Sequence, residues 1–187
     1  ASLPGPSKAR SILKESKIPT IVVSDGPAKK AVKQFEEDGF GYLIIEADSM
    51  IGARREFLDP VEMALYNADV IKVLSVTGAF NVLCSAVDEV IANCRQGGEL
   101  SLPKMIVDKE KAVEAAGFGN DYAKVKAMAA YEIARRVADM TVEGCFVVRE
   151  WERYIRLVAS GHEMMRTAAR LADEAREIEK GEDTLRR

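Results

Sequence analysis

The chain has 187 residues, of which 48% are hydrophobic and 30% are charged, and its formal net charge is -3 at pH 7. This composition predicts a folded domain, with or without an appended helical part, and the acidic balance argues against a nucleic-acid-binding surface, which needs clustered Lys and Arg. No apolar run reaches the roughly 18 residues of a membrane span and no basic-apolar signal opens the chain, so the sequence predicts a cytoplasmic protein without membrane contact.

The first segments predict alternating helix and strand. Residues 1–10 contain two prolines and a glycine, which predict a loop, and residues 7–16 predict a short helix. Residues 18–26 predict an apolar strand, residues 27–41 a helix, and residues 41–48 a second, buried strand. Two strands joined by a helix indicate a parallel unit, which needs further strands from a later segment, another chain or an earlier part of a larger domain.

A helix start is predicted at Asp59. Asp59 is a good N-cap, Pro60 suits the first helical position, and Glu62 places a carboxylate at the positive end of the helix dipole. The helix should run to about Ser75 and end at Thr77-Gly78, after which a second helix follows.

The remaining segments are mostly helical in pattern. Met105–Val107 could be a strand or an extended link, and Asp108 caps a short helix after it. An apolar stripe rich in small residues predicts a closely packed helix, and it consists of Ala127, Ala130, Tyr131, Ala134, Val137 and Ala138. A short strand is predicted near residues 144–149, before a long final amphipathic helix.

The sequence therefore predicts an α/β fold class in two parts. Residues 1–58 form a partial parallel α/β domain of Rossmann-like type. Residues 59–187 form an Ala-rich helical bundle part with the short strand near 144–149.

A candidate ligand site follows the second strand. The stretch DSMIGARREFLDP, residues 48–60, carries Arg54 and Arg55 just beyond a carboxyl strand end, where ligands bind in open α/β sheets. The two guanidinium groups could hold phosphate or carboxylate, and a solvated turn with an Arg55–Asp59 ion pair is an equal alternative. Thr77 and Gly78 could touch a ligand, although a helix stop is the simpler interpretation.

The sole histidine is His162, beside Gly161 within the last predicted helix. Glycine disfavours a helix interior, so it suggests close approach by a ligand or another backbone, while a buried structural histidine is the alternative. HEMMR lacks the second histidine of a zinc-binding HExxH helix, and the three cysteines form no CxxC pair. The sequence predicts no metal site.

Six segments together resemble a known family. PGPSKAR, ADSMIGARREFLDPVEMALYNADVIKVLSVTGAF, VDKEKAVEAAGF, YAKVKAMAAYEIARRVAD, VEGCFVV and HEMMRTAARLADEAREIEK are similar, in this order, to archaeal coenzyme F420-dependent methylenetetrahydromethanopterin dehydrogenases. The resemblance covers nearly the whole chain. It implies an oxidoreductase that transfers hydride reversibly between methylenetetrahydromethanopterin and coenzyme F420, an 8-hydroxy-5-deazaflavin cosubstrate, in methanogenic one-carbon metabolism. It also implies no metal, no flavin prosthetic group and a homohexameric assembly.

The resemblance suggests roles for the candidate site residues. The residues expected to bind the coenzyme are Asp48, Arg54, Arg55, Lys72, Thr77 and Gly78. The expected catalytic residues are Glu56, Asp59 and His162, of which Glu56 or Asp59 could stabilise the cationic methenyl product.

The chain also departs from the family pattern. Glu46, Ser49 and Asn81 stand where that pattern has Lys, Pro and Arg. Family members extend further at the N-terminus, and this part is expected to supply the first βα units of the sheet. A truncated or diverged helical scaffold that homo-oligomerises without catalysis is therefore the alternative function.

Overall fold

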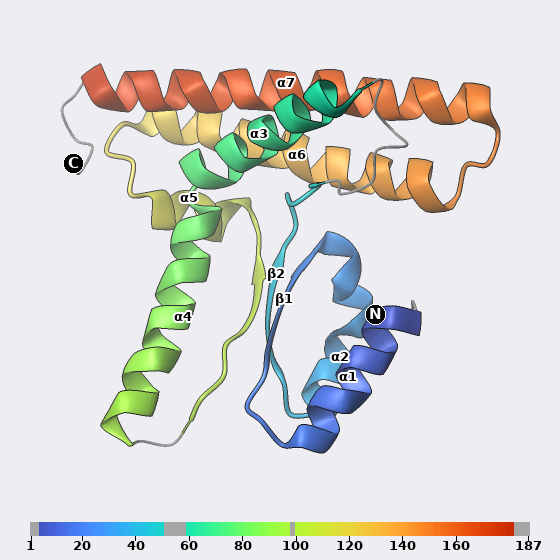
Figure 1. Ribbon diagram of the computed structural model, residues 1–187. Coiled ribbons are helices and arrows are strands. Elements are labelled where there is room, and N and C mark those ends of the chain that lie inside the picture. The colour runs from blue at the N-terminus through green and yellow to red at the C-terminus, as the bar shows by residue number, and fades with distance from the viewer. Residues whose placement is uncertain (1–3, 51–58, 98–99, 182–187) are drawn as a thin grey trace.

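A computed structural model describes residues 4–50, 59–97 and 100–181. The elements in chain order are α1 (Pro4–Ser16), β1 (Ile21–Asp25), the 3-10 helix η1 (Gly26–Ala31), α2 (Val32–Glu37), β2 (Gly41–Ile45), α3 (Pro60–Val76), α4 (Ala79–Gln96), β3 (Lys104–Val107), α5 (Lys109–Ala116), α6 (Asp121–Phe146) and α7 (Trp151–Gly181). Helices α6 and α7 lie side by side with α3 across them, and the sheet stands beneath this helical layer between α4 and the pair α1 and α2 (Figure 1).

The sheet is parallel and has the strand order β1-β2-β3. All five residues of β2 are buried, as expected for a central strand covered on both faces. Gly41 begins β2 where a Cβ would lie 2.8 Å from the Cβ of Leu102, so the strand and the segment before β3 approach closely. Met105–Val107, for which strand and link were both open, is a strand, and the sheet draws strands from both sides of residue 58.

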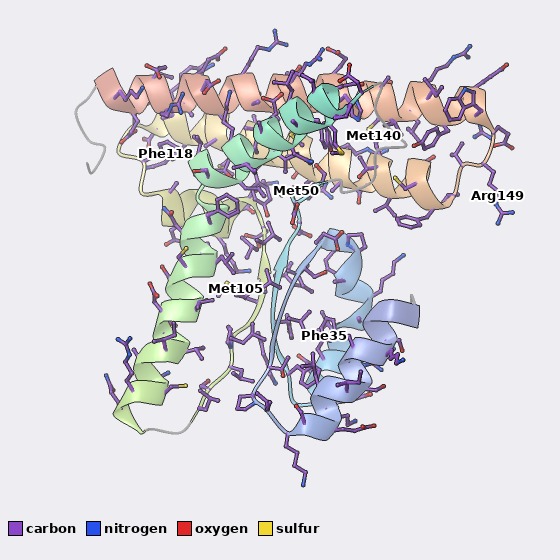
Figure 2. All side chains as sticks on the ribbon, in the orientation of Figure 1. Phe35, Met50, Met105, Phe118, Met140 and Arg149 are labelled. Carbon is purple, nitrogen blue, oxygen red and sulfur yellow. The ribbon has the colours of Figure 1, made fainter. Side chains whose placement is uncertain are left out.

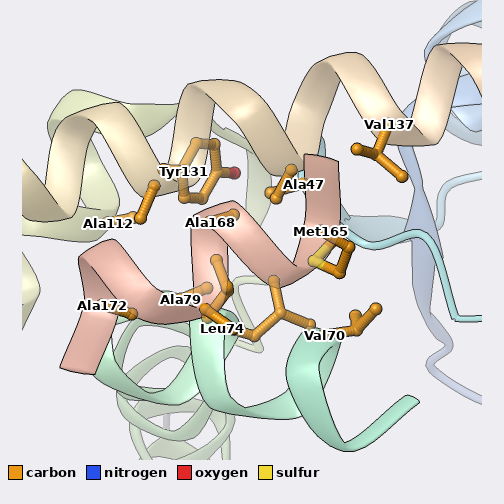
Figure 3. Close-up of a cluster of buried hydrophobic side chains, with 14 of the residues drawn as sticks. Ala47, Val70, Leu74, Ala79, Ala112, Tyr131, Val137, Met165, Ala168 and Ala172 are labelled. Atoms are coloured by element: carbon orange, nitrogen blue, oxygen red, sulfur yellow. The ribbon is translucent and has the colours of Figure 1, made fainter. Parts of the chain in front are cut away.

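The helical layer packs through small side chains. The predicted apolar stripe of α6 is buried along its whole length. Figure 3 shows Tyr131 of α6 near Ala168 and Met165 of α7, with Leu74 and Val70 of α3 close by. Alanines let helix axes come close, so most of the core lies between these three helices and the carboxyl end of the sheet.

The short strand predicted near residues 144–149 is wrong. Helix α6 continues through Phe146, and residues 147–150 form the turn into α7. Gly144 keeps this turn of α6 close to α7, because a Cβ there would lie 2.9 Å from Cγ2 of Val158. Val147 and Val148 lie in this turn and pair with no strand among the described residues, so their β-propensity has no effect on the fold.

The predicted loop over residues 1–10 is wrong from Pro4 onward, whereas the predicted helix over residues 7–16 is confirmed. Helix α1 begins at Pro4. Proline is tolerated in the first helical turn, because the N–H groups there have no partner within the helix.

The break between α3 and α4 confirms the expected stop at Thr77-Gly78. Helix α3 ends at Val76, and Gly78 adopts a φ of 89° before α4 begins. No single helix among residues 4–50, 59–97 and 100–181 is long and apolar enough to cross a membrane. Only α3 and α4 taken as a pair would meet that test by length and composition, and they bend by 65° at this break.

Candidate functional site

The carboxyl end of the sheet faces the helical layer. β1 ends at Asp25, Asp48 follows β2, and Asp108 follows β3. The Asp48 carboxylate accepts a hydrogen bond from the Met50 N–H at 3.0 Å. Burial raises the pKa of Asp48, the Met50 bond opposes this rise and the charge of Asp25 adds to it. Figure 2 places Met50 where the strands meet the helices, so the predicted residue Asp48 lies at the junction of the two layers.

Two buried tyrosines of the helical layer form hydrogen bonds with residues at, or just beyond, the carboxyl ends of β2 and β3. The Tyr66 hydroxyl of α3 lies 3.1 Å from the carbonyl oxygen and 2.9 Å from the hydroxyl oxygen of Ser49. The Tyr131 hydroxyl of α6 donates to the carbonyl oxygen of Val107, the last residue of β3. Burial raises the pKa of Tyr66 to about 12, so this tyrosine remains protonated at neutral pH.

The His162 ring packs against the Tyr66 ring. The two rings are 4.7 Å apart between centroids, and Nδ1 of His162 is 3.4 Å from Oε1 of Glu62 in the first turn of α3. A cavity of about 10 Å³ adjoins them, lined by Glu62, Leu65, Tyr66, Asp69, His162 and Arg166. The cavity has room for at most about one water molecule. The His162 side chain is itself packed into the protein, and 7% of its surface is exposed.

A larger cleft of about 310 Å³ continues along α3 and α7. Its charged lining residues are Asp69, Lys72, Glu163, Arg166, Arg170 and Asp173. Lys72 pairs with Asp173 at 2.8 Å and Arg166 with Glu163 at 2.7 Å. Ligand sites usually enclose roughly 300 to 1,000 Å³, so the cleft has the size and the charge to receive a polar or anionic group.

Asp69 lies between the small cavity and the cleft and lines both. Burial raises the pKa of Asp69, and the nearby charges of Lys72 and Arg166 oppose that rise.

Three of the predicted site residues lie at the two ends of α3. Asp59 caps its start, where the side chain accepts the Glu62 N–H at 2.8 Å, and the Glu62 side chain in turn lies 3.4 Å from His162. Thr77 and Gly78 are buried at the other end. A Cβ on Gly78 would lie 2.2 Å from the carbonyl oxygen of Ala112, so Gly78 packs directly against α5.

Three predicted residues, Arg54, Arg55 and Glu56, lie outside the described residues. Over the described ranges, no three His, Cys, Asp or Glu side chains gather in a way that could hold a metal ion.

The departure at Glu46 has a local partner. Its carboxylate pairs with Nζ of Lys29 at 2.6 Å, and the Glu46 side chain is 15% exposed.

The sequence interpretation missed a polar face of α3. Glu62, Tyr66 and Asp69 follow one another at helical spacing of four and three residues, and all three line the small cavity. This spacing of polar groups on one side of a largely apolar helix was the available signal. Arg166 could not be found in that way, because only the packing of α7 on α3 brings it to this face.

Comparison with known proteins places this chain in a family. The family model described as methylene-5,6,7,8-tetrahydromethanopterin dehydrogenase matches residues 1–187. F420-dependent methylenetetrahydromethanopterin dehydrogenase of Archaeoglobus fulgidus is 60% identical over 185 residues, covering 99% of this chain and 67% of that protein. The enzyme of the same name from Methanothermobacter thermautotrophicus is 54% identical over 184 residues, covering 98% of this chain and 67% of that protein.

A solved structure is similar to this chain over nearly the whole of its length. It is described as F420 dependent methylene-tetrahydromethanopterin dehydrogenase in complex with methylene-tetrahydromethanopterin and coenzyme F420. It superposes with a TM-score of 0.89 and 54% identity over 97% of this chain and 65% of its own length. This chain thus spans about two thirds of the length of its relatives. It belongs to the methylene-5,6,7,8-tetrahydromethanopterin dehydrogenase family.

Proposed function

We propose that the chain catalyses reversible hydride transfer between methylenetetrahydromethanopterin and oxidised coenzyme F420. The observation that carries this proposal is its similarity, at 54% identity and a TM-score of 0.89, to a structure described as holding both compounds. Small-molecule reactants and no metal belong to the proposal, as do the cytoplasmic location and homo-oligomeric state that were expected from the sequence.

The reaction requires little acid–base catalysis from the protein. The methylene carbon gives up hydride and becomes a methenyl cation, while the deazaflavin accepts the hydride at C5 together with one proton. Both reactants carry the reactive atoms, so the protein mainly has to hold them face to face, exclude water and stabilise charge. Among the described residues, the polar cluster around Tyr66 and His162 contains no nucleophile paired with its own base, which is compatible with this task.

The charged residues supply the binding groups. Lys72 and Arg166 of the α3–α7 cleft could each exchange a carboxylate partner for an anionic tail of a reactant, because both partners are partly exposed. Asp48 places a carboxylate at the sheet end, where it could accept a hydrogen bond from the coenzyme. Arg54 and Arg55 for a tail and Glu56 and Asp59 near the reacting atoms complete the proposed set. His162, packed against Tyr66 and Glu62, would act on the reaction through those neighbours.

An anaerobic absorbance assay tests the function directly. The chain is mixed with coenzyme F420 and methylenetetrahydromethanopterin, and loss of the absorbance of the oxidised deazaflavin is followed against a reaction without the pterin. Reduction above the uncatalysed rate is the expected result. If folded chain neither accelerates reduction nor binds either compound, the proposal fails and the non-catalytic scaffold replaces it.

A further inference from the structure

Tyr66 connects three parts of the chain that are distant in sequence. Its ring packs on His162 of α7, its backbone belongs to α3, and its hydroxyl contacts Ser49 beyond β2. The side chain is almost completely buried. A hydroxyl has one proton to donate and can also accept, so Tyr66 can donate to the Ser49 carbonyl while it accepts the proton of the Ser49 hydroxyl. Both the backbone and the side chain of Ser49 are thereby held.

The residues on either side of Ser49 depend on this contact. The Asp48 N–H donates to the Ile45 carbonyl at 3.2 Å, and the Met50 N–H donates to the Asp48 carboxylate at 3.0 Å. These bonds are local to the turn and do not attach it to the helical layer. Tyr131 of α6 hydrogen-bonds the backbone of Glu46 and Ala47 before Asp48. Tyr66 attaches Ser49 after it, so Tyr66 fixes the distal side of the turn that carries the Asp48 carboxylate.

We propose that Tyr66 is a positioning residue, which sets the placement of the Asp48–Met50 segment for the reactants through its contact with Ser49 and its packing on His162. The inference rests on the proposed function, in which Asp48 and its neighbours face a reactant. Tyr66 itself touches neither reactant in this scheme. Its burial keeps the phenol neutral, so it holds the segment as a hydrogen-bonding group and not as a charge.

The hydroxyl contact predicts a specific kinetic effect. Tyr66→Phe keeps the ring on His162 and removes only the hydroxyl. In the absorbance assay, kcat/KM for coenzyme F420 is expected to fall about tenfold, the effect of losing one buried hydrogen bond. Ser49→Ala should give part of the same loss, and the double variant should be no worse than Tyr66→Phe alone, because the two groups act as one unit.

Tyr42→Phe is the matched control. Tyr42 lies on β2 and is equally buried, but its hydroxyl donates to Glu36 at 3.2 Å on the α2 side of the sheet. This variant also removes one tyrosine hydroxyl bond, and it is expected to leave kcat/KM within about twofold of the parent chain.

Hydrogen exchange separates placement from stability. In Tyr66→Phe the Ser49 and Met50 amides should exchange about tenfold faster, while the amides of α6 keep their protection. Unchanged kcat/KM in Tyr66→Phe, with an active parent chain, would overturn the inference and leave the proposed function standing. Faster exchange without a kinetic change would reduce Tyr66 to a structural contact. A parent chain that binds and reduces nothing would remove both proposals.

Discussion

Nδ1 of His162 lies 3.4 Å from Oε1 of Glu62, so the middle of α7 is joined to the first turn of α3 beside the carboxyl end of the sheet. The same imidazole packs on Tyr66 and is almost fully buried. His162→Ala should lower the free energy of unfolding by about 2 to 3 kcal/mol, because it removes a buried ring and leaves a cavity. Chemical denaturation measures this loss. Glu163→Ala is the control, because the Glu163 side chain at the next position of α7 is exposed. Its free energy of unfolding should stay within about 0.5 kcal/mol of that of the parent chain.

Lys72 should affect reactant binding more than stability. Lys72 forms an ion pair with Asp173, and each of the two side chains is about one third exposed. Ion pairs of this kind contribute at most about 1 kcal/mol to the free energy of unfolding. Lys72→Met is expected to raise KM for the anionic coenzyme several-fold with little change in kcat. Lys14→Met is the control, since Lys14 of α1 pairs with Asp38 at the end of α2 at 2.6 Å and does not line the cleft. Equal kinetics for the two variants would remove Lys72 from the binding set.

Gly78→Ala should strongly lower the free energy of unfolding. Its φ of 89° disfavours any side chain, and the new Cβ would lie 2.2 Å from the Ala112 carbonyl oxygen and 2.5 Å from the Ala116 nitrogen. The expected loss is at least about 3 kcal/mol. Gly97→Ala tests the backbone strain alone, because Gly97 has a φ of 66° and open space around it; that loss should be only about 1 to 2 kcal/mol. Equal losses would contradict the close packing of α4 and α5 at Gly78.

Glu179 fastens the end of α7 to the start of α6. Its buried carboxylate accepts hydrogen bonds from the N–H of Gly119 at 2.6 Å and of Asn120 at 3.1 Å. Glu179→Gln replaces one accepting oxygen by a donor, so one N–H loses its acceptor and stability should fall by about 1 to 3 kcal/mol. Glu177→Gln, two residues earlier and exposed, should change stability by less than about 0.5 kcal/mol. A thermal melt that ranks these variants in the opposite order would contradict this role of Glu179.

Stability at alkaline pH should depend on Tyr66. Its pKa is raised from 10.0 to about 12, mainly by burial, so between these values the unfolded chain releases a proton that the folded chain retains. Stability contributed by this group is therefore complete below pH 10.0 and decreases as the pH rises toward about 12. Tyr66→Phe should lose less stability than the parent chain over this interval, by up to roughly 2 to 3 kcal/mol. Urea midpoints at pH 8, 10 and 11 measure the difference, and parallel curves would contradict the raised pKa.

Local sequence signals predicted a substantial part of the fold. The run of β-branched residues in β1, the apolar run of β2 and the capping signature at Asp59 each depend on neighbouring residues only. The small-residue stripe of α6 is likewise a property of one helix. For the site, the position of Asp48 after a parallel strand was enough to place it at the carboxyl end of the sheet.

The arrangement around the site depends on contacts between distant segments. The sequence by itself determined the strands β1 and β2, the start and end of α3, the buried face of α6 and the family to which the chain belongs. Tertiary structure alone decided that Met105–Val107 joins the sheet, that α6 continues through Gly144, and that Tyr66 meets both Ser49 and His162. The physical reason is that caps and periodicity act within a few residues of the chain, whereas strand pairing and ring packing are set by the partner that the folded chain brings alongside.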